Sequence, residues 1–166
     1  PTILDTSNSF YGTDYNKKYV TWCSENLEGI QFKNNFLKPN LDFKDDFMDI
    51  IYGISIFTHL SEELHFSWII ELTRVLKNDG ILFLTTHGDA HKFKLLPKEQ
   101  VIYENGNLVV HGYKKEGNRL YASYQSPKFM KKLCSKNNLK VLKHIPGETR
   151  NSQPQQDVWI LRLIKN

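Results

Sequence analysis

The run FMDIIYGISIF (Phe47–Phe57) limits the folds open to this chain more than any other stretch of the sequence. It is apolar almost throughout, as expected of a strand covered on both faces at the centre of a parallel sheet. Residues 61–80 then have the pattern of an amphipathic helix, which Ser61 can cap and Asn78-Asp79-Gly80 can end. A second apolar run, Ile81–Thr86, follows. Strand, helix and strand in this order predict a parallel βαβ unit.

The residues before this unit repeat its pattern, whereas those after it change character. Strands are predicted at Thr2–Asp5, Phe10–Asp14 and Ile30–Asn35, with a helix between the last two that Asn16 caps and Gly29 ends. Residues 98–125 contain two turn signals between β-rich runs, which predicts a small β meander. A helix from Ser126 and two final strands, in LKVLKHIPG and QDVWILRLIK, complete a single α/β domain over 1–166.

Composition narrows the class of protein. The chain has 166 residues, of which 40% are hydrophobic and 24% charged, as in an ordinary soluble globular protein. We expect no membrane partner, because no apolar run approaches the ~20 residues that span a bilayer. Cys23 and Cys134 have no CxxC or zinc spacing, so we expect reduced thiols in a cytoplasmic protein. The net charge of +4 comes from scattered lysines and favours no class of partner.

The candidate functional residues lie where the predicted strands end, because open parallel sheets bind ligands outside the carboxyl ends of their strands. Asp14 ends the second predicted strand. Its carboxylate could accept hydrogen bonds from the two vicinal hydroxyls of a ribose, or could instead cap the helix that begins at Asn16. The other strand-end residues are Asp5, Asn34, Asn35, Gly53 to His59 and Thr86 to Asp89.

Histidines form a second candidate group, because neutral histidine is the commonest general base. His59 ends a buried strand, where a purely structural role is the alternative. His87 and His91 stand four apart in HGDAH, a spacing that could share a metal on a helix. Gly88 and the preceding strand make this segment a loop, so we expect no metal. The GxSxG, HExxH and GxxxxGK[ST] motifs of hydrolases, zinc proteases and P-loop proteins are absent.

Taken in order, four segments resemble the class I S-adenosylmethionine-dependent methyltransferases, in the small-molecule branch of the type 11/12 kind. They are YGTDYNKKYVTWCSENL, NNFLKPNLDF, DIIYGISIFTHLSEE and ELTRVLKNDGILFLTTHG. The resemblance implies a Rossmann-like, mostly parallel seven-stranded sheet of order 3-2-1-4-5-7-6 with an antiparallel last strand. It also implies methyl transfer from S-adenosylmethionine to a small-molecule acceptor, with S-adenosylhomocysteine as product. A homodimer is left open.

The resemblance also implies site residues. Asp14 would hold the ribose hydroxyls, Tyr15 would flank the adenine, and Asn34 or Asn35 would lie near its amino group. The remaining residues implied for the cofactor are Asp5, Gly53, Ile54 and Phe57. If the acceptor needs a base, the candidates are His59, His87, His91 and Tyr103, of which His59 and His87 rank first. The predicted meander would cover the acceptor. We expect no nucleic-acid partner, because the Asp/Asn-Pro-Pro-aromatic segment of N6-adenine methyltransferases does not follow Gly53.

One part of the family pattern is lacking. The glycine-rich turn and the helix after it should follow Asp5, yet only Thr6–Ser9 separate Asp5 from the next predicted strand. Four residues can close an antiparallel hairpin, but a parallel crossover needs a dozen or more. We therefore expect that this loop and helix are missing between about residues 5 and 9. A hairpin and a natural deletion are the alternatives, and a deletion would favour a non-catalytic binding protein with the methyltransferase fold.

Overall fold

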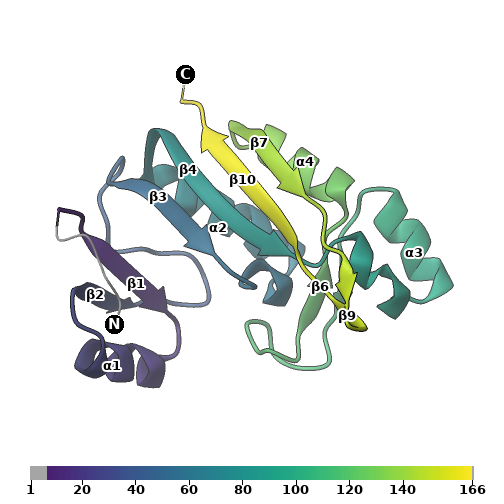
Figure 1. The fold of residues 1–166 in the computed structure, drawn as a ribbon, viewed down its shortest axis with the longest axis horizontal. Coiled ribbons are helices and arrows are strands. Elements are labelled where there is room, and N and C mark those ends of the chain that lie inside the picture. The colour runs from purple at the N-terminus through teal and green to yellow at the C-terminus, as the bar shows by residue number, and fades with distance from the viewer. Residues whose placement is uncertain (1–6, 166) are drawn as a thin grey trace. The chain divides into compact units, whose positions relative to one another are not determined.

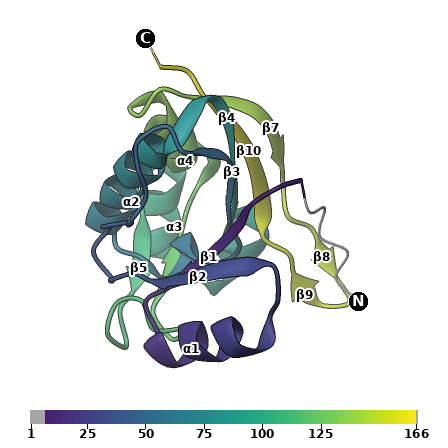
Figure 2. The ribbon, with the colours of Figure 1, turned by 90° about the vertical axis from the view of Figure 1, so that its left-hand side faces the viewer.

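A computed structural model describes residues 7–165, which fall into two compact units divided after Asp42. In the first unit, β1 (Phe10–Asp14) and β2 (Ile30–Asn34) pair in parallel and α1 (Lys17–Asn26) connects them (Figure 2). The side chain of Asn16 accepts a hydrogen bond from Lys18 N and so caps α1. These two strands and the helix confirm the sequence prediction. The predicted strand Thr2–Asp5 and the junction after it lie outside the described residues.

The second unit is built on a four-stranded sheet of order β3-β4-β10-β7 (Figure 1). β3 (Met48–Gly53) pairs in parallel with β4 (Leu76–Thr86), and β10 (Asp157–Leu163) runs antiparallel to both β4 and β7 (Leu139–Ile145). The antiparallel last strand is therefore as predicted. The seven-stranded, mostly parallel sheet is not confirmed, because this sheet is mixed and the strands of the first unit form a separate pair.

Helices cover one face of this sheet, where the core lies. α2 (Glu62–Val75) and α4 (Pro127–Ser135) pack on the same side of it (Figure 2). Ser61 and Ser126 cap them as predicted, accepting hydrogen bonds from Leu64 N and Phe129 N. Fully buried side chains from both layers form the core, and each contributes roughly 1.5–3 kcal/mol. They include Ile69, Leu82, Leu84, Phe129, Leu133, Trp159 and Leu161.

Two strand boundaries differ from the prediction. β3 ends at Gly53, and a short 3-10 turn, η1 (Phe57–His59), follows it. β4 begins at Leu76, so the Asn78-Asp79-Gly80 turn lies inside the strand as a bulge between two stretches of pairing with β3. Asp79 takes the left-handed backbone conformation there, with φ 62°. The prediction that these residues end the helix is therefore wrong, because α2 ends at Val75 and Asn78-Asp79-Gly80 interrupts β4.

Residues 98–125 do not form the predicted β meander. They begin inside a helix, α3 (Pro97–Glu104), and end in a single antiparallel pair, β5 (Val109–His111) with β6 (Ala122–Tyr124). Proline at the first turn and Glu99, which accepts a hydrogen bond from Leu96 N, favour the helix. A second short pair, β8 (Thr149–Arg150) with β9 (Gln153–Pro154), precedes β10.

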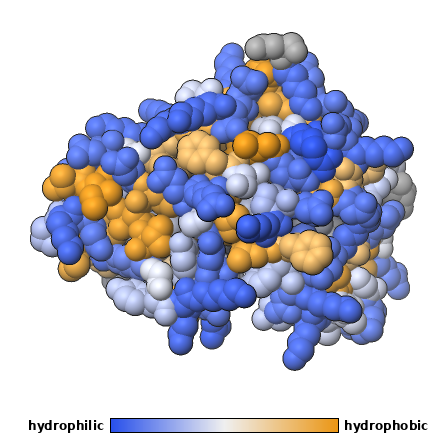
Figure 3. Space-filling model, turned by 180° about the vertical axis from the view of Figure 1, so that it is seen from behind, coloured by the Kyte–Doolittle hydropathy of each residue, from blue (hydrophilic) through white to orange (hydrophobic). Residues whose placement is uncertain are grey.

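The side of the second unit around α3 presents apolar side chains to solvent. From behind, orange side chains gather on this side (Figure 3). Phe93, in η2 (Asp89–Lys94), is 69% exposed, and Leu96 and Val101 are more than half exposed. A grouped apolar surface of this kind suits an apolar ligand or partner. Among residues 7–165, no helix is long and apolar enough to span a bilayer.

Both cysteines are free thiols, as predicted. Cys134 lies in α4 and is buried in the core, and this burial raises the pKa of its thiol to about 12. The thiolate is the reactive form, so Cys134 is inert at neutral pH. Cys23, in α1, is partly exposed.

Candidate functional site

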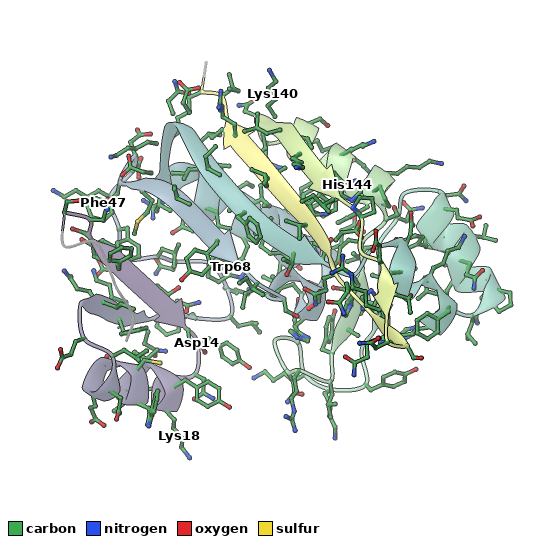
Figure 4. All side chains as sticks on the ribbon, in the orientation of Figure 1. Asp14, Lys18, Phe47, Trp68, Lys140 and His144 are labelled. Carbon is green, nitrogen blue, oxygen red and sulfur yellow. The ribbon has the colours of Figure 1, made fainter. Side chains whose placement is uncertain are left out.

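In the first unit, the carboxyl ends of β1 and β2 bring three of the predicted residues together (Figure 4 labels Asp14). Asp14 lies directly opposite Asn34 in the strand register. The Asp14 carbonyl oxygen accepts hydrogen bonds from Asn34 Nδ2 at 2.7 Å and from Asn35 N at 3.1 Å. One carboxylate oxygen of Asp14 accepts from Asn16 N at 2.6 Å, which orients the carboxylate at the entry to α1.

Asn35 carries a buried acceptor without a hydrogen-bond partner among residues 7–165. Its side chain is 9% exposed, and its Nδ2 donates to Phe36 O at 3.0 Å. Its Oδ1 has no hydrogen-bond partner within the part of the chain that the structure describes. Leaving a buried oxygen unpaired costs about 1–3 kcal/mol, so a donor from a ligand would account for it. Asn35 Oδ1 can accept a hydrogen bond from a donor such as an amino group, and the Asp14 carboxylate can accept from hydroxyls. Tyr15 follows Asp14 and is half exposed.

In the second unit, a polar network fixes the end of β3. Ser55 has φ 60°, a left-handed conformation that is uncommon outside glycine and is often found at functional sites. Its backbone N–H donates to Thr85 Oγ1 at 2.8 Å. Gln156 joins the same two residues, donating to Ser55 Oγ at 2.8 Å and accepting from Thr85 Oγ1 at 2.6 Å. The network leaves Ile54 61% exposed, next to Gly53 at the strand end.

Phe57 has a different setting from Gly53 and Ile54. Its ring is buried and contacts His65 edge to face, with ring centroids 5.2 Å apart. Its carbonyl oxygen accepts hydrogen bonds from Ser123 Oγ and Gln125 Nε2, both at 3.0 Å. The Phe57 side chain therefore belongs to the core of the second unit.

The two candidate bases come together along one strand. His59 Nδ1 lies 2.8 Å from Tyr121 O, and His87 Nδ1 lies 3.0 Å from Ser123 O, so both imidazoles bond to the edge of β6 and the residue before it. Burial is the largest influence on His87 and lowers its pKa to about 4. The pKa of about 4 is the net result: the hydrogen bond to Ser123 opposes the effect of burial, and electrostatic interactions with Lys94 and His59 add to it. His87 is therefore neutral at pH 7.

Aromatic rings enclose His87. The ring of His91 lies on one side with centroids 4.3 Å apart, and the ring of Tyr124 stacks at 5.2 Å. His91 is 4% exposed, and burial lowers its pKa to about 4. Its Nδ1 has no hydrogen-bond partner among residues 7–165. Within those residues, no group of three or more metal-ligating side chains is placed to hold a metal ion.

Gln125 is the main residue that the sequence analysis did not single out. It is fully buried, and its side-chain oxygen accepts from His87 N at 3.1 Å. Its amide nitrogen lies 3.0 Å from both Phe57 O and His65 Nε2. Gln125 thus links η1, α2 and the loop after β4. A single glutamine ahead of the capping residue Ser126 carries no sequence signal for such a role.

His65 should make the stability of the second unit depend on pH. It is fully buried, its Nδ1 bonds to Ser61 O, and burial lowers its pKa from 6.5 to about 4. The unfolded chain therefore binds a proton at a higher pH than the folded chain. Stability is complete above pH 6.5 and falls as the pH is lowered toward 4, by about 3 kcal/mol from this residue. Urea unfolding at pH 7.5 and 4.5 should show a smaller pH effect in His65→Gln than in the wild type, and an equal effect would contradict this.

Gly88 lies against the buried carboxylate of Asp157, at the start of β10. Asp157 is 1% exposed, its Oδ2 is 2.7 Å from His144 Nε2, and its Oδ1 accepts from Gly147 N (Figure 4 labels His144). The His144 ring stacks on Trp159, with centroids 3.8 Å apart. A Cβ added to Gly88 would lie 1.9 Å from the Asp157 carboxylate. The packing of this carboxylate therefore requires glycine at position 88.

Replacing Gly88 with alanine should lower the free energy of unfolding by about 3 kcal/mol, because Asp157 must move and give up its buried partners. Thermal and urea denaturation would measure the loss. Gly112→Ala is the matched control, since a Cβ there would be 3.6 Å from the nearest atom, an ordinary contact. Equal stability of the two variants would show that the Asp157 carboxylate does not depend on Gly88.

Comparison with known proteins identifies the fold. A family model described as "Methyltransferase domain" matches residues 2–84, half of the chain. A search of curated proteins finds no match. An S-adenosylmethionine-dependent methyltransferase from Methanosarcina mazei is 18% identical, with a TM-score of 0.69 over 97% of this chain and 85% of that one. At this identity the similarity shows a Rossmann-like methyltransferase fold.

Two further solved structures have the same fold. The 1,6-didemethyltoxoflavin-N1-methyltransferase of Burkholderia thailandensis, with 1,6-didemethyltoxoflavin and S-adenosylhomocysteine bound, is 10% identical with a TM-score of 0.68. The magnesium protoporphyrin IX methyltransferase of Synechocystis PCC 6803, with S-adenosylhomocysteine bound, is 14% identical with a TM-score of 0.62. The matches cover 95% and 92% of this chain, but only 62% and 63% of those two.

Proposed function

Since this chain belongs to the methyltransferase-domain family that uses S-adenosylmethionine, we propose that it transfers a methyl group from that cofactor to a small-molecule acceptor. The observation that carries the proposal is the strand edge of the first unit. There Asn35, whose buried Oδ1 has no partner among the described residues, donates its backbone N–H to Asp14 O. The apolar surface around α3 and the small-molecule methyltransferases among the similar structures support the class of acceptor.

The cofactor-binding residues that the family resemblance implies are proposed for each unit in turn. In the first, Asp14 would bind the ribose hydroxyls, Asn35 would accept from the adenine amino group, and Tyr15 would flank the ring. Asn34 orients Asp14 through its carbonyl oxygen. In the second, Gly53 and Ile54 would line the methionine part. The assignment of Asp5, which lies outside the described residues, stays a prediction, and so does that of Phe57.

The chain's chemical task is to align the acceptor, exclude water and accept a proton. When bound, S-adenosylmethionine would supply an electrophilic methyl carbon for the acceptor's lone pair, with its sulfur as the leaving group that keeps the electron pair. The proton that a hydroxyl or amine acceptor loses passes to a ring nitrogen of His59 or His87. Burial keeps His87 uncharged at pH 7, so its imidazole can take the proton.

Isothermal titration calorimetry with S-adenosylhomocysteine tests the proposal, followed by transfer of a radiolabelled methyl group to a small-molecule extract. We expect saturable binding at one site per chain and label in a low-molecular-weight product. Binding without transfer to any acceptor would favour the second candidate function, a non-catalytic binding protein. The titration is made on the natural protein, with the loop if it carries one, and no binding at all would overturn the use of this cofactor.

We also propose that the glycine-rich loop and its helix are missing between about residues 5 and 9 of this sequence. Support comes from β3, where Ile50 and Tyr52 are 64% and 72% exposed on the sheet face that α2 and α4 do not cover. Parallel sheets are normally covered on both faces, so a further helix is expected there. Sequencing the transcript and weighing the intact natural protein would test this. A transcript that joins Asp5 directly to Thr6 would refute it.

The cellular setting follows from the same proposal. Two free cysteines, one of them buried in α4, support a protein of the reducing cytoplasm. A homodimer stays a prediction, which size-exclusion chromatography with light scattering would test.

A further inference from the structure

We propose that β6, locked in place by Gln125, positions both candidate bases and presents Nε2 of each to the acceptor. The inference rests on the proposed function, in which His59 and His87 are those bases. It makes Gln125 a positioning residue, because its side chain acts on the histidines through the backbone and through β6.

The two histidines bond to carbonyl oxygens two residues apart. His59 Nδ1 meets Tyr121 O, and His87 Nδ1 meets Ser123 O. Alternate carbonyls of an extended strand point the same way, and β6 pairs with β5 through its other edge. The edge of β6 and the residue before it, Tyr121, therefore hold two imidazoles that come from different parts of the chain, η1 and the loop after β4.

These bonds select the tautomer of each histidine. A carbonyl oxygen can only accept, so Nδ1 must carry the hydrogen in both rings. When Nδ1 is protonated in a neutral imidazole, Nε2 holds the lone pair, and the bond made by one nitrogen sets the role of the other. Both histidines thus keep Nε2 as the basic nitrogen. A general base needs this nitrogen within hydrogen-bond reach of the proton it takes.

Gln125 connects β6 to both histidine-bearing segments. Its backbone N–H donates to His87 O at 3.0 Å, and its side-chain oxygen accepts from His87 N at 3.1 Å. Its amide nitrogen donates to Phe57 O at 3.0 Å, two residues before His59. Ser123, also fully buried, donates to the same carbonyl. With these bonds, the segments that carry the bases cannot shift along β6 independently.

A neighbouring histidine supports this reading of the network. His65 Nδ1 lies 2.7 Å from Ser61 O, so it too must carry the hydrogen. Its Nε2 then accepts from the Gln125 amide, which fixes the orientation of that amide. The amide oxygen consequently faces His87 N, as the network requires. The carbonyl of Ser61 thus sets the tautomer of His65, and His65 in turn sets the orientation of the Gln125 amide.

Nuclear magnetic resonance of the histidine side chains tests the inference directly. Long-range proton–nitrogen spectra distinguish the two tautomers, and single His→Gln variants assign the six histidines. In the wild-type protein at pH 7.5, His59 and His87 should both show a protonated Nδ1 and an unprotonated Nε2. A protonated Nε2 on either ring would overturn the proposal, whether or not the enzyme transfers methyl groups.

The Gln125→Met variant, of similar size, tests the positioning role. We expect kcat to fall about tenfold or more, unchanged affinity for S-adenosylhomocysteine, and mixed tautomers at His87. Gln155→Met is the matched control, because Gln155 is exposed and touches neither histidine. Unchanged kcat and tautomers in folded Gln125→Met would refute the role. If that variant does not fold, the wild-type spectra still test the inference, because they show which nitrogen of His59 and His87 carries the hydrogen. A failure of the proposed function can be told apart from a failure of this inference, because the wild-type protein would then not bind the cofactor or not transfer a methyl group.

Discussion

Replacing Asp14 with alanine should weaken binding of S-adenosylhomocysteine by about 30- to 1,000-fold, which corresponds to about 2–4 kcal/mol. The carboxylate lies at the carboxyl end of β1, where it would accept hydrogen bonds from both ribose hydroxyls. Charge-assisted bonds of this kind are about twice as strong as neutral ones. Calorimetric titration of the folded variant measures the loss, and wild-type affinity would sink the assignment.

Asp14 also shapes its own unit, so alanine alone cannot separate binding from local folding. One carboxylate oxygen accepts from Asn16 N at 2.6 Å, at the entry to α1. Asp14→Asn keeps an oxygen for that bond and removes the charge and one acceptor. We expect this control to retain the fold and still bind at least about tenfold more weakly than the wild type. If Asp14→Ala binds S-adenosylhomocysteine weakly but Asp14→Asn binds it with wild-type affinity, the role of Asp14 is to orient the start of α1 and not to bind the ribose.

The parts of the fold that local chemistry determines could be predicted from the sequence. Ser61, Asn16 and Ser126 each cap the helix they were expected to cap, because a capping bond spans only two or three residues. The group at Asp14, Asn34 and Asn35 was predictable too, since parallel strands joined by a helix end at the same edge. The structure places all three within hydrogen-bond contact.

What the sequence could not reveal depends on pairings distant in the chain or on competing local signals. Gln125 meets His65 across 60 positions and Phe57 across 68, and no pattern in the sequence marks such partners. The error at α3 has a different cause. The β-rich run around Val101 and the turn signal after it predicted strands, whereas Pro97 and Glu99 at a helix start favour the helix that the structure has.

His59 and His87 are the two residues proposed to take the proton from the acceptor. If the acceptor needs a base, replacing the true base with alanine should lower kcat by ~10²-fold while affinity for S-adenosylhomocysteine is kept. His111→Ala serves as the control, because the His111 imidazole bonds to the Glu99 carboxylate and not to a carbonyl of β6. The measurement is initial rate at saturating cofactor. Near-normal turnover in both His59→Ala and His87→Ala would mean that alignment alone drives the transfer, or that the base lies elsewhere.

The dependence of kcat on pH then distinguishes between the two histidines. Burial holds the pKa of His87 near 4, so His87 stays unprotonated throughout the range from pH 5.5 to 8. If His87 is the base, kcat should be flat over that range in the wild type and in His59→Ala. A fall in kcat as the pH drops through this range would exclude His87 as the base, provided that urea unfolding shows the protein still folded at pH 5.5. That proviso is needed because protonation of the buried His65 weakens the fold over the same range.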